Sequence, residues 1–182
     1  SISGSVGGSI SYSSATTSVI SVSSSNLQVK GVGSSVITAT FTPTDTANYN
    51  TATTTMTVTV GAASVTITPT ISNSSMTYAS SSPYPSTGYS TSPSISFTGG
   101  TAPTCSLYLT SDTGYATTKT INGSLAAGSY VVHCSGASLT NYTFTYASDA
   151  SFTVNKGTPT FNSWSNVSKS YGCLLYTSPS PR

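Results

Sequence analysis

Charged side chains are almost missing from this chain of 182 residues, in which Asp, Glu, Lys and Arg together make up 4%. There is no glutamate, and the five basic residues are scattered along the sequence. Proteins that bind nucleic acid or anionic lipid through electrostatics carry clustered Lys and Arg side chains. The sequence therefore predicts neither a nucleic-acid partner nor attraction to a charged lipid surface.

Long apolar runs and helix-favouring residues are also missing. No apolar stretch approaches the length of about 20 residues that a transmembrane helix needs, so we expect no membrane insertion. Glu, Leu, Gln, Lys and Arg favour helices and are rare, whereas Val, Ile, Thr and Tyr favour strands and are common. Low charge with abundant Ser and Thr also occurs in disordered chains, but a hydrophobic content of 36% weighs against disorder. We therefore predict an all-β fold.

Apolar residues alternate with Ser or Thr along many short segments, which is the pattern of a half-buried strand. In TTTMTVTV, the residues Met56, Val58 and Val60 fall on one face and the threonines on the other. Clusters of Gly, Ser, Pro and Asn, which favour turns, separate these segments. About seven short strands in roughly 90 residues is typical of an immunoglobulin-like β-sandwich, so we expect tandem domains of this fold class.

Three pairs of segments recur in the same order. NYNTATTTMTVTV from Asn48 resembles NYTFTYASDASFTV from Asn141, and MTYASS resembles SKSYG at the same offset of about 93 residues. GSISYSS near Ile10 also resembles SPSISFTG near Ile95, at an offset of about 85 residues. These matches predict a tandem repeat of about 90 to 95 residues.

The repeats divide the chain into units. Residues 1–61 form a first unit that lacks a counterpart of the opening strand of the second, so we expect it to be N-terminally truncated. Residues 62–156 form the second unit, and residues 157–172 begin a truncated third unit in which Trp164 would anchor a core. We expect residues 158–172 to be poorly packed. Linkers of only a few residues between units favour a stiff array.

The last ten residues, 173–182, break this pattern. CLLYTSPSPR is led by Cys173 and is rich in proline, and all ten residues resemble the translation of a commonly used transposase sequencing adapter. We therefore interpret residues 173–182 as an adapter-derived tail of a metagenomic fragment and exclude Cys173 from the fold. The alternative is a genuine Pro-rich tail with a third cysteine.

Particular stretches resemble known bacterial repeats. TAPTCS, AAGSYVVHCSGAS and NYTFTYASDASFTVNK in the second unit resemble the MBG-type bacterial Ig-like repeats. SISYSSATTSVISVSSSNLQVKGVGSSVITATF and DTANYN in the first unit resemble the Ig-like repeats of bacterial surface proteins. The resemblance implies tandem modules of long secreted or cell-surface proteins, often adhesins that act in cell adhesion, with neighbouring repeats of the same chain as partners. It implies no active site and no cofactor.

Two cysteines, Cys105 and Cys134, remain once Cys173 is excluded. Alternation in CSLYL and YVVHC points both side chains inward from strands. A disulfide between them would close a loop of about 30 residues, provided that their Cα atoms lie within about 7 Å. The MBG-type resemblance carries both positions, and a disulfide would fit an extracellular compartment. Two buried free thiols are the alternative.

The remaining chemistry-bearing residues give no catalytic or metal motif. His133 is the only histidine, and alternation places it on the face opposite Cys134, where we expect it to be exposed and without a role. DTANYN, from Asp45, departs from the calcium-loop pattern, so we predict a loop there and no metal site. Tyr84 and Tyr89 in the segment SSPYPSTGYS are candidates for contact with a carbohydrate.

The sequence therefore predicts a non-catalytic stalk or spacer of a long bacterial cell-surface or secreted adhesin-like protein. The alternative is an Ig-like module whose loops bind a polysaccharide or a host protein, in which case changing Tyr84 and Tyr89 to alanine would abolish binding. We expect no enzyme within these residues.

Overall fold

The structure is a computed structural model that describes residues 6–160 and Tyr171. These residues contain twelve β-strands and no helix, which confirms the all-β prediction for the described part of the chain. In this part there is accordingly no helix that could cross a membrane. Trp164, Cys173 and most of the segment 158–172, which was predicted to be poorly packed, lie outside the described residues.

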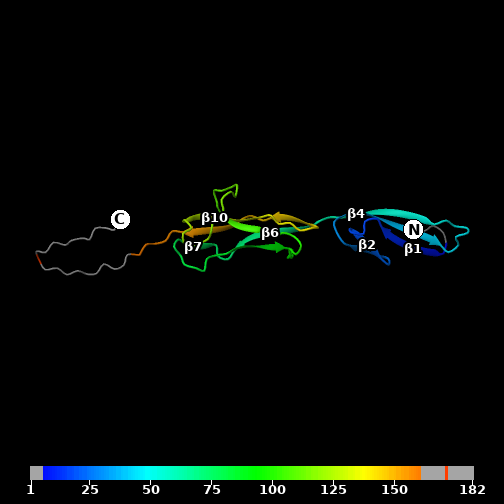
Figure 1. The fold of residues 1–182 in the computed structure, drawn as a ribbon, viewed down its shortest axis with the longest axis horizontal. Helices are drawn as coiled ribbons and strands as arrows, with labels where there is room; N and C mark the ends of the chain where they lie inside the picture. The colour runs from blue at the N-terminus through cyan, green and yellow to red at the C-terminus, as the bar shows by residue number, and fades with distance from the viewer. Residues whose placement is uncertain (1–5, 161–170, 172–182) are drawn as a thin grey trace.

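The strands fall into two groups that lie end to end along the long axis of the molecule (Figure 1). The first unit contains β1 (Gly8–Ser14), β2 (Ile20–Ser23), β3 (Asn26–Val29), β4 (Gly33–Pro43) and β5 (Ala52–Val60). The second unit contains β6 (Ala63–Ile71), β7 (Ser75–Thr77), β8 (Thr87–Ser92), β9 (Thr104–Leu109), β10 (Gly128–Ser135), β11 (Tyr142–Tyr146) and β12 (Ala150–Asn155).

The second unit is built from two sheets with the strand orders β7-β12-β10-β9 and β11-β6-β8. The central strand β6 contacts β10 and β12 of the other sheet. Along β6, Val65 and Ile67 are fully buried while Thr66 and Thr68 are exposed, as the alternation of apolar residues and threonine predicts. The largest group of buried side chains comes from the first sheet and its loops: Leu107, Leu125, Tyr130, Val132, Phe152 and Val154.

The first unit has only one sheet of three strands, in the order β1-β4-β5, together with the hairpin formed by β2 and β3. Its core is small and lies at the end of the unit nearest the second unit. Val19 and Ile20 pack on Ile37 of β4, with Val58 and Val60 of β5 beside them. The rest of the inner face of this sheet carries no second layer among the described strands.

The two units share a strand-pairing register. Gly33 at the start of β4 pairs with Val60 of β5, and Gly128 at the start of β10 pairs with Val154 of β12. β1 pairs with β4 on its other side, and β9 pairs with β10 in the same antiparallel way. β1, β4 and β5 therefore correspond to β9, β10 and β12.

This correspondence corrects one of the three sequence matches. Ile10 lies in β1, whereas Ile95 lies in the irregular connection between β8 and β9 and belongs to no strand. Near Ile95 the neighbouring Phe97 stacks on Phe144 of β11, with ring centroids 5.5 Å apart. Short Ser-rich alternating segments recur in this composition without occupying equivalent places, so the offset of about 85 residues has no structural meaning.

Candidate functional site

Asn141 of the second unit connects the two units by a side-chain hydrogen bond that is separate from the covalent linker. Its side-chain Oδ1 accepts a hydrogen bond of 3.0 Å from the backbone N–H of Val32, in the turn before β4. Its own backbone carbonyl accepts a hydrogen bond of 3.0 Å from the N–H of Ala63, the first residue of β6. Asn141 therefore accepts one hydrogen bond from the first unit and another from the first residue of β6.

The backbone at Asn141 is suited to this contact. Its φ of 71° lies in the left-handed region, which asparagine adopts more readily than other residues with a side chain. The turn that it meets is equally constrained, because a Cβ added to Gly31 would lie 3.0 Å from the carbonyl oxygen of Ser18. A crevice of about 250 Å³ runs along this junction, lined by Val29, Lys30, Gly31, Val32, Val60, Gly61, Ala63, Asn141 and Tyr142.

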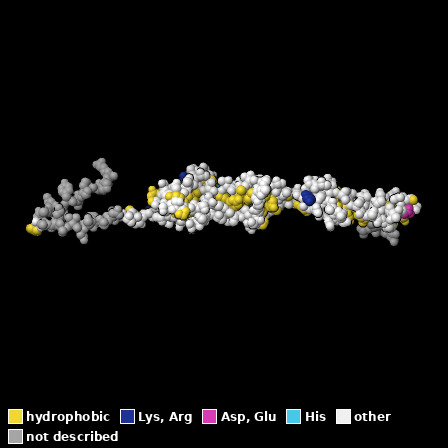
Figure 2. Space-filling view, turned by 60° about the horizontal axis from the view of Figure 1, so that its bottom comes forward, with side chains coloured by type: hydrophobic (Ala, Val, Ile, Leu, Met, Phe, Trp, Pro, Cys, Tyr) yellow, Lys and Arg dark blue, Asp and Glu magenta, His cyan; other side chains and the backbone are white. Residues whose placement is uncertain are grey.

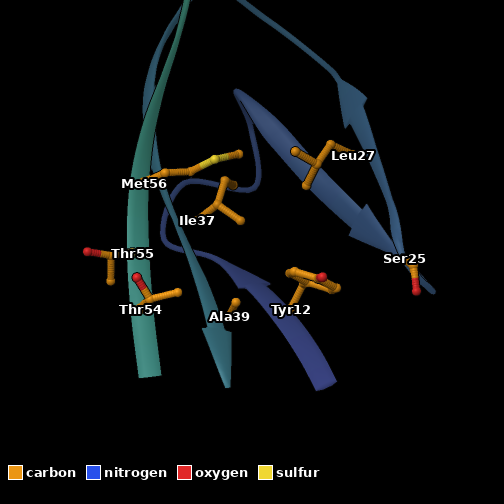
Figure 3. A pocket seen from close by; sticks show the side chains of 8 residues that line it. All are labelled: Tyr12, Ser25, Leu27, Ile37, Ala39, Thr54, Thr55 and Met56. Atoms are coloured by element: carbon orange, nitrogen blue, oxygen red, sulfur yellow. The ribbon is translucent and has the colours of Figure 1, made fainter. Parts of the chain in front are cut away.

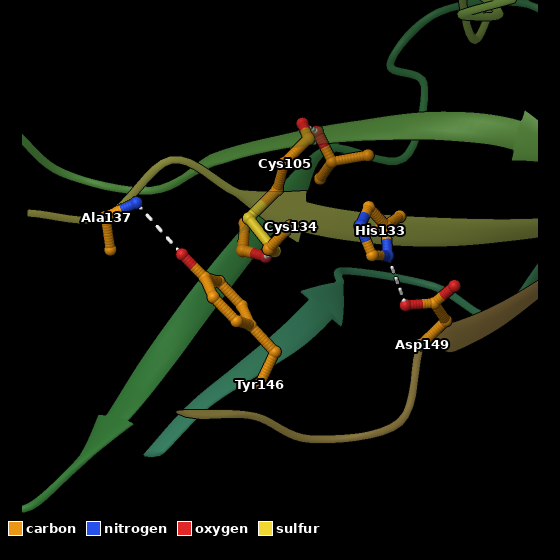
Figure 4. Close-up of a disulfide and its surroundings, with 8 residues drawn as sticks. Cys105, His133, Cys134, Ala137, Tyr146 and Asp149 are labelled. Carbon is orange, nitrogen blue, oxygen red and sulfur yellow. Dashed lines mark hydrogen bonds and ion pairs between the residues drawn. A yellow bond between two sulfur atoms is a disulfide. The ribbon is translucent and has the colours of Figure 1, made fainter. Parts of the chain in front are cut away.

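Cys105 and Cys134 are joined by a disulfide in the structure (Figure 4). They lie directly opposite each other on β9 and β10, with Cα atoms 4.0 Å apart. Cys134 is buried, as the alternation in YVVHC predicts. The hydroxyl of Thr87, in β8, donates to the carbonyl of Cys105 at 3.1 Å, so the opposite sheet covers this end of the pair. Of the two alternatives left open by the sequence, the structure has the disulfide.

His133 differs from its prediction, because it is half-buried and bonded. Alternation places it correctly on the face opposite Cys134, but the connection between β9 and β10 folds over that face. Nδ1 of His133 lies 2.9 Å from Oδ1 of Asp149 (Figure 4), and the hydroxyl of Tyr115 donates to Oδ2 of the same carboxylate at 2.8 Å. The rings of Tyr115 and His133 stack with centroids 3.6 Å apart.

This cluster ties a loop to the sheet. Within the loop, the carboxylate of Asp112 accepts backbone hydrogen bonds from Ala116 and Thr117 at 3.1 and 2.9 Å. Both oxygens of Asp149 are already engaged, by Tyr115 and His133. The described residues contain no group of three or more side chains able to hold a metal ion. The geometry therefore describes a closed hydrogen-bonded network that orders the loop.

The cluster raises the pKa of Tyr115. The hydrogen bond to Asp149 is the main reason that the pKa of Tyr115 lies above its ordinary value of 10.0, and desolvation and the negative charge of Asp149 act in the same direction. A raised pKa contributes stability that is present below pH 10 and is lost as the pH rises through the folded value. We expect the loop to loosen above that value, and Asp149→Asn to lower the pKa of Tyr115 towards 10.0.

Carbon-13 NMR of tyrosine ring carbons over an alkaline titration measures this directly, with Tyr115→Phe to assign the resonance. Tyr108, whose ring meets that of Tyr115 edge-on at 5.3 Å, is the internal control. A Tyr115 resonance that titrates identically in the parent chain and in Asp149→Asn would contradict the network.

Tyr84 and Tyr89 have different surroundings. Tyr84 lies in the connection between β7 and β8, where its hydroxyl would lie 3.3 Å from a Cβ added to Gly123. Tyr89 lies on β8, and its ring meets Phe97 edge-on at 6.1 Å. Phe97 stacks on Phe144, so Tyr89 begins a row of rings that continues along β11. The two tyrosines therefore contact different neighbours in the structure.

Sequence reasoning identified the cysteine pair but not Asn141 or the cluster at Asp149. Asn-Tyr recurs at Asn48 and Asn141, but this recurrence does not predict the junction. In the first unit, the side chain of Asn48 instead donates to Asp45 at 2.8 Å within a turn. No protein-family model matches this sequence, and no curated protein matches it.

Proposed function

We propose that this chain is a non-catalytic structural stalk of a long bacterial cell-surface or secreted protein of the adhesin kind. Its units would be tandem immunoglobulin-like β-sandwiches of the MBG type, and their neighbours in the same chain would be their main partners. The observation that carries this proposal is the junction at Asn141, which joins two β-units end to end by a hydrogen bond outside the covalent linker.

The surface fits a role that needs solubility without charge. Figure 2 shows a face on which charged side chains are few and most atoms belong to other polar side chains or to the backbone. Threonine is β-branched and favours strands, so it can cover an outer strand face without adding charge. Thr55, Thr57 and Thr59 of β5 are all exposed in this way.

The disulfide supports an extracellular or cell-surface location. Disulfides persist in oxidising environments and are rare in reducing ones. The bond between Cys105 and Cys134 would then persist outside the cell and stabilise the fold of the second unit.

A stiff stalk predicts that both units share one orientation in solution. Asn141→Gly keeps the left-handed backbone accessible but removes the acceptor for Val32. A hydrogen bond contributes about 0.5 to 1.5 kcal/mol net, so we expect the equilibrium constant for the closed junction to fall about two- to tenfold. NMR residual dipolar couplings should fit one alignment tensor for both units in the parent chain and two tensors in Asn141→Gly.

Asn73→Gly, at an exposed position between β6 and β7, is the matched control and should leave the single tensor intact. If the parent chain already requires two tensors, the units move independently and the stalk proposal fails. Small-angle scattering on the same samples provides a second measurement, since an independent hinge shortens the average largest dimension.

A further inference from the structure

The disulfide of the second unit lies at the edge of its sheet. In the strand order β7-β12-β10-β9, β10 lies between two strands, whereas β9 ends the sheet. Cys105 of β9 lies directly opposite Cys134 of β10, so the bond spans from the interior of the sheet to its edge. Cys134 is 1% exposed, whereas Cys105 is only partly buried. The two ends of the bond therefore differ in their access to solvent.

A groove of about 480 Å³ runs along this edge, and Cys105 lines it while Cys134 does not. Its walls are residues 85–87, 105–107 and 118–121. The last of these segments is tied to β9, because the backbone N–H of Lys119 donates to the carbonyl of Leu107 at 2.7 Å. Ligand pockets of about 300 to 1,000 Å³ hold drug-sized molecules, so this groove can hold a small organic thiol.

The other end of the bond is covered. Sγ of Cys134 lies 3.8 Å from the backbone carbonyl oxygen of Gly88 in β8. A thiolate attacks a disulfide sulfur on the side opposite the bond that breaks, and the rate depends on access to that sulfur. Such an approach to Cys134 comes from the β12 side, through the interior of the unit. The same approach to Cys105 comes from beyond the edge strand, where the groove lies.

The charge of the groove favours an anion. Lys119 is the only charged residue that lines it, and the other lining residues are apolar or carry hydroxyl groups. A nearby positive charge stabilises a thiolate relative to the neutral thiol. The groove therefore suits a small thiol that also carries carboxylates.

We propose that Cys105 is a site of S-thiolation, at which a low-molecular-weight anionic thiol opens the disulfide through the groove. The thiolate sulfur forms a bond to Sγ of Cys105, and the bond between Cys105 and Cys134 breaks. The electron pair of that bond leaves on Sγ of Cys134, which takes up a proton from water. One disulfide is lost and one is formed, so the step needs no other oxidant or reductant.

Burial of Cys134 slows this reaction without redirecting it. A thiolate released into apolar surroundings is a poor leaving group, so exchange at Cys105 is slow. Attack on Cys134 would release Cys105 into the groove that holds Lys119, but the incoming sulfur has no open path to Cys134. Access therefore decides which sulfur reacts. The inference goes beyond the proposed function, because it concerns the chemistry of one bond and not the mechanical role of the units.

The position of Lys119 makes the test direct, because trypsin cleaves after it and places the two cysteines on different peptides. The full chain with Cys173→Ser is incubated with reduced glutathione, quenched with acid, and treated with N-ethylmaleimide in urea to block free thiols. Mass spectrometry then reads each cysteine separately. We expect glutathione on Cys105 with maleimide on Cys134 to exceed the reverse pattern at least about tenfold.

The same chain incubated with glutathione in urea is the control for the fold. Both sulfurs are then open, so we expect glutathione on Cys105 and Cys134 in similar amounts. Lys119→Gln tests the charge, with the rate followed by the mass of the intact chain. We expect glutathione to add roughly two- to threefold more slowly, because one charge acts weakly through water. Lys30→Gln, in the first unit, is the matched control and should leave the rate unchanged.

Three results would overturn the proposal. The first is glutathione on Cys134 at least as often as on Cys105 in the folded chain. The second is a bond that glutathione opens in urea but not in the folded chain, since the groove would then admit no thiol. The third is maleimide on both cysteines before any glutathione is added, which would show that no disulfide is present. A rate unchanged in Lys119→Gln would overturn the assignment of the groove to an anionic thiol.

Discussion

Replacement of Phe152 by alanine is expected to lower the free energy of unfolding of the second unit by about 3 to 5 kcal/mol. Phe152 is 1% exposed and lies in the core with Tyr130, Val132 and Val154. Truncation removes the buried ring and leaves a cavity that the surrounding strands fill only in part. Urea unfolding of the full chain, followed by the methyl resonances of Met56 and Met76, measures both units separately.

The expected result is an earlier transition for Met76 and an unchanged transition for Met56, because each unit has its own core. Ile10→Ala is the matched surface control in the first unit and leaves both methionine probes in place. The side chain of Ile10 is 49% exposed, so we expect a change in the free energy of unfolding within about 0.5 kcal/mol. Coincident early transitions of both units after Phe152→Ala would show that they unfold as one block.

Removal of the disulfide is expected to have an effect of similar size. Cys105 and Cys134 are separated by 29 residues. In the chain-entropy model, releasing a loop of this length destabilises the native state by about 3 to 4 kcal/mol. Comparison of the Cys105→Ala, Cys134→Ala double variant with the parent chain, both carrying Cys173→Ser to prevent exchange, gives the difference by urea unfolding.

Reduction of the parent protein with dithiothreitol provides the second measurement, since it breaks the S–S bond but removes no side-chain atom. Both treatments should lower the urea concentration at which the second unit unfolds and leave that of the first unit unchanged. If neither changes the transition, the two thiols are not joined in solution, and the extracellular location loses its main support.

Period-two alternation predicted the strands well wherever one face of a strand meets a core. Val65 and Ile67 in β6, and Tyr130 and Val132 in β10, are buried at alternate positions as their sequences indicate. Alternation also correctly predicted that the side chain of Cys134 points into the core. Alternation succeeds at these places because burial of one strand face is a local property of the sequence.

The features that sequence reasoning missed depend on contacts between distant segments. His133 was placed on the correct face, but the loop that carries Tyr115 covers it, and no local pattern predicts where that loop lies. Asn141 meets Val32 across 109 residues. No local pattern predicts that the inner face of β5 at Met56 is left uncovered by the other described strands (Figure 3).

The shared register gives the disulfide a consequence under tension. The position of Cys105 opposite Cys134 corresponds to that of Tyr12 opposite Ala39, so the same frame has a covalent link in one unit and none in the other. When a chain is pulled from its ends, the segment between the linked cysteines, which are 29 positions apart, cannot extend and adds nothing to the stretched length. At about 3.5 Å per residue, the second unit would lengthen by roughly 100 Å less than an unlinked unit of its size. A row of such units would therefore contain extensible and inextensible segments set by the presence or absence of one cysteine pair.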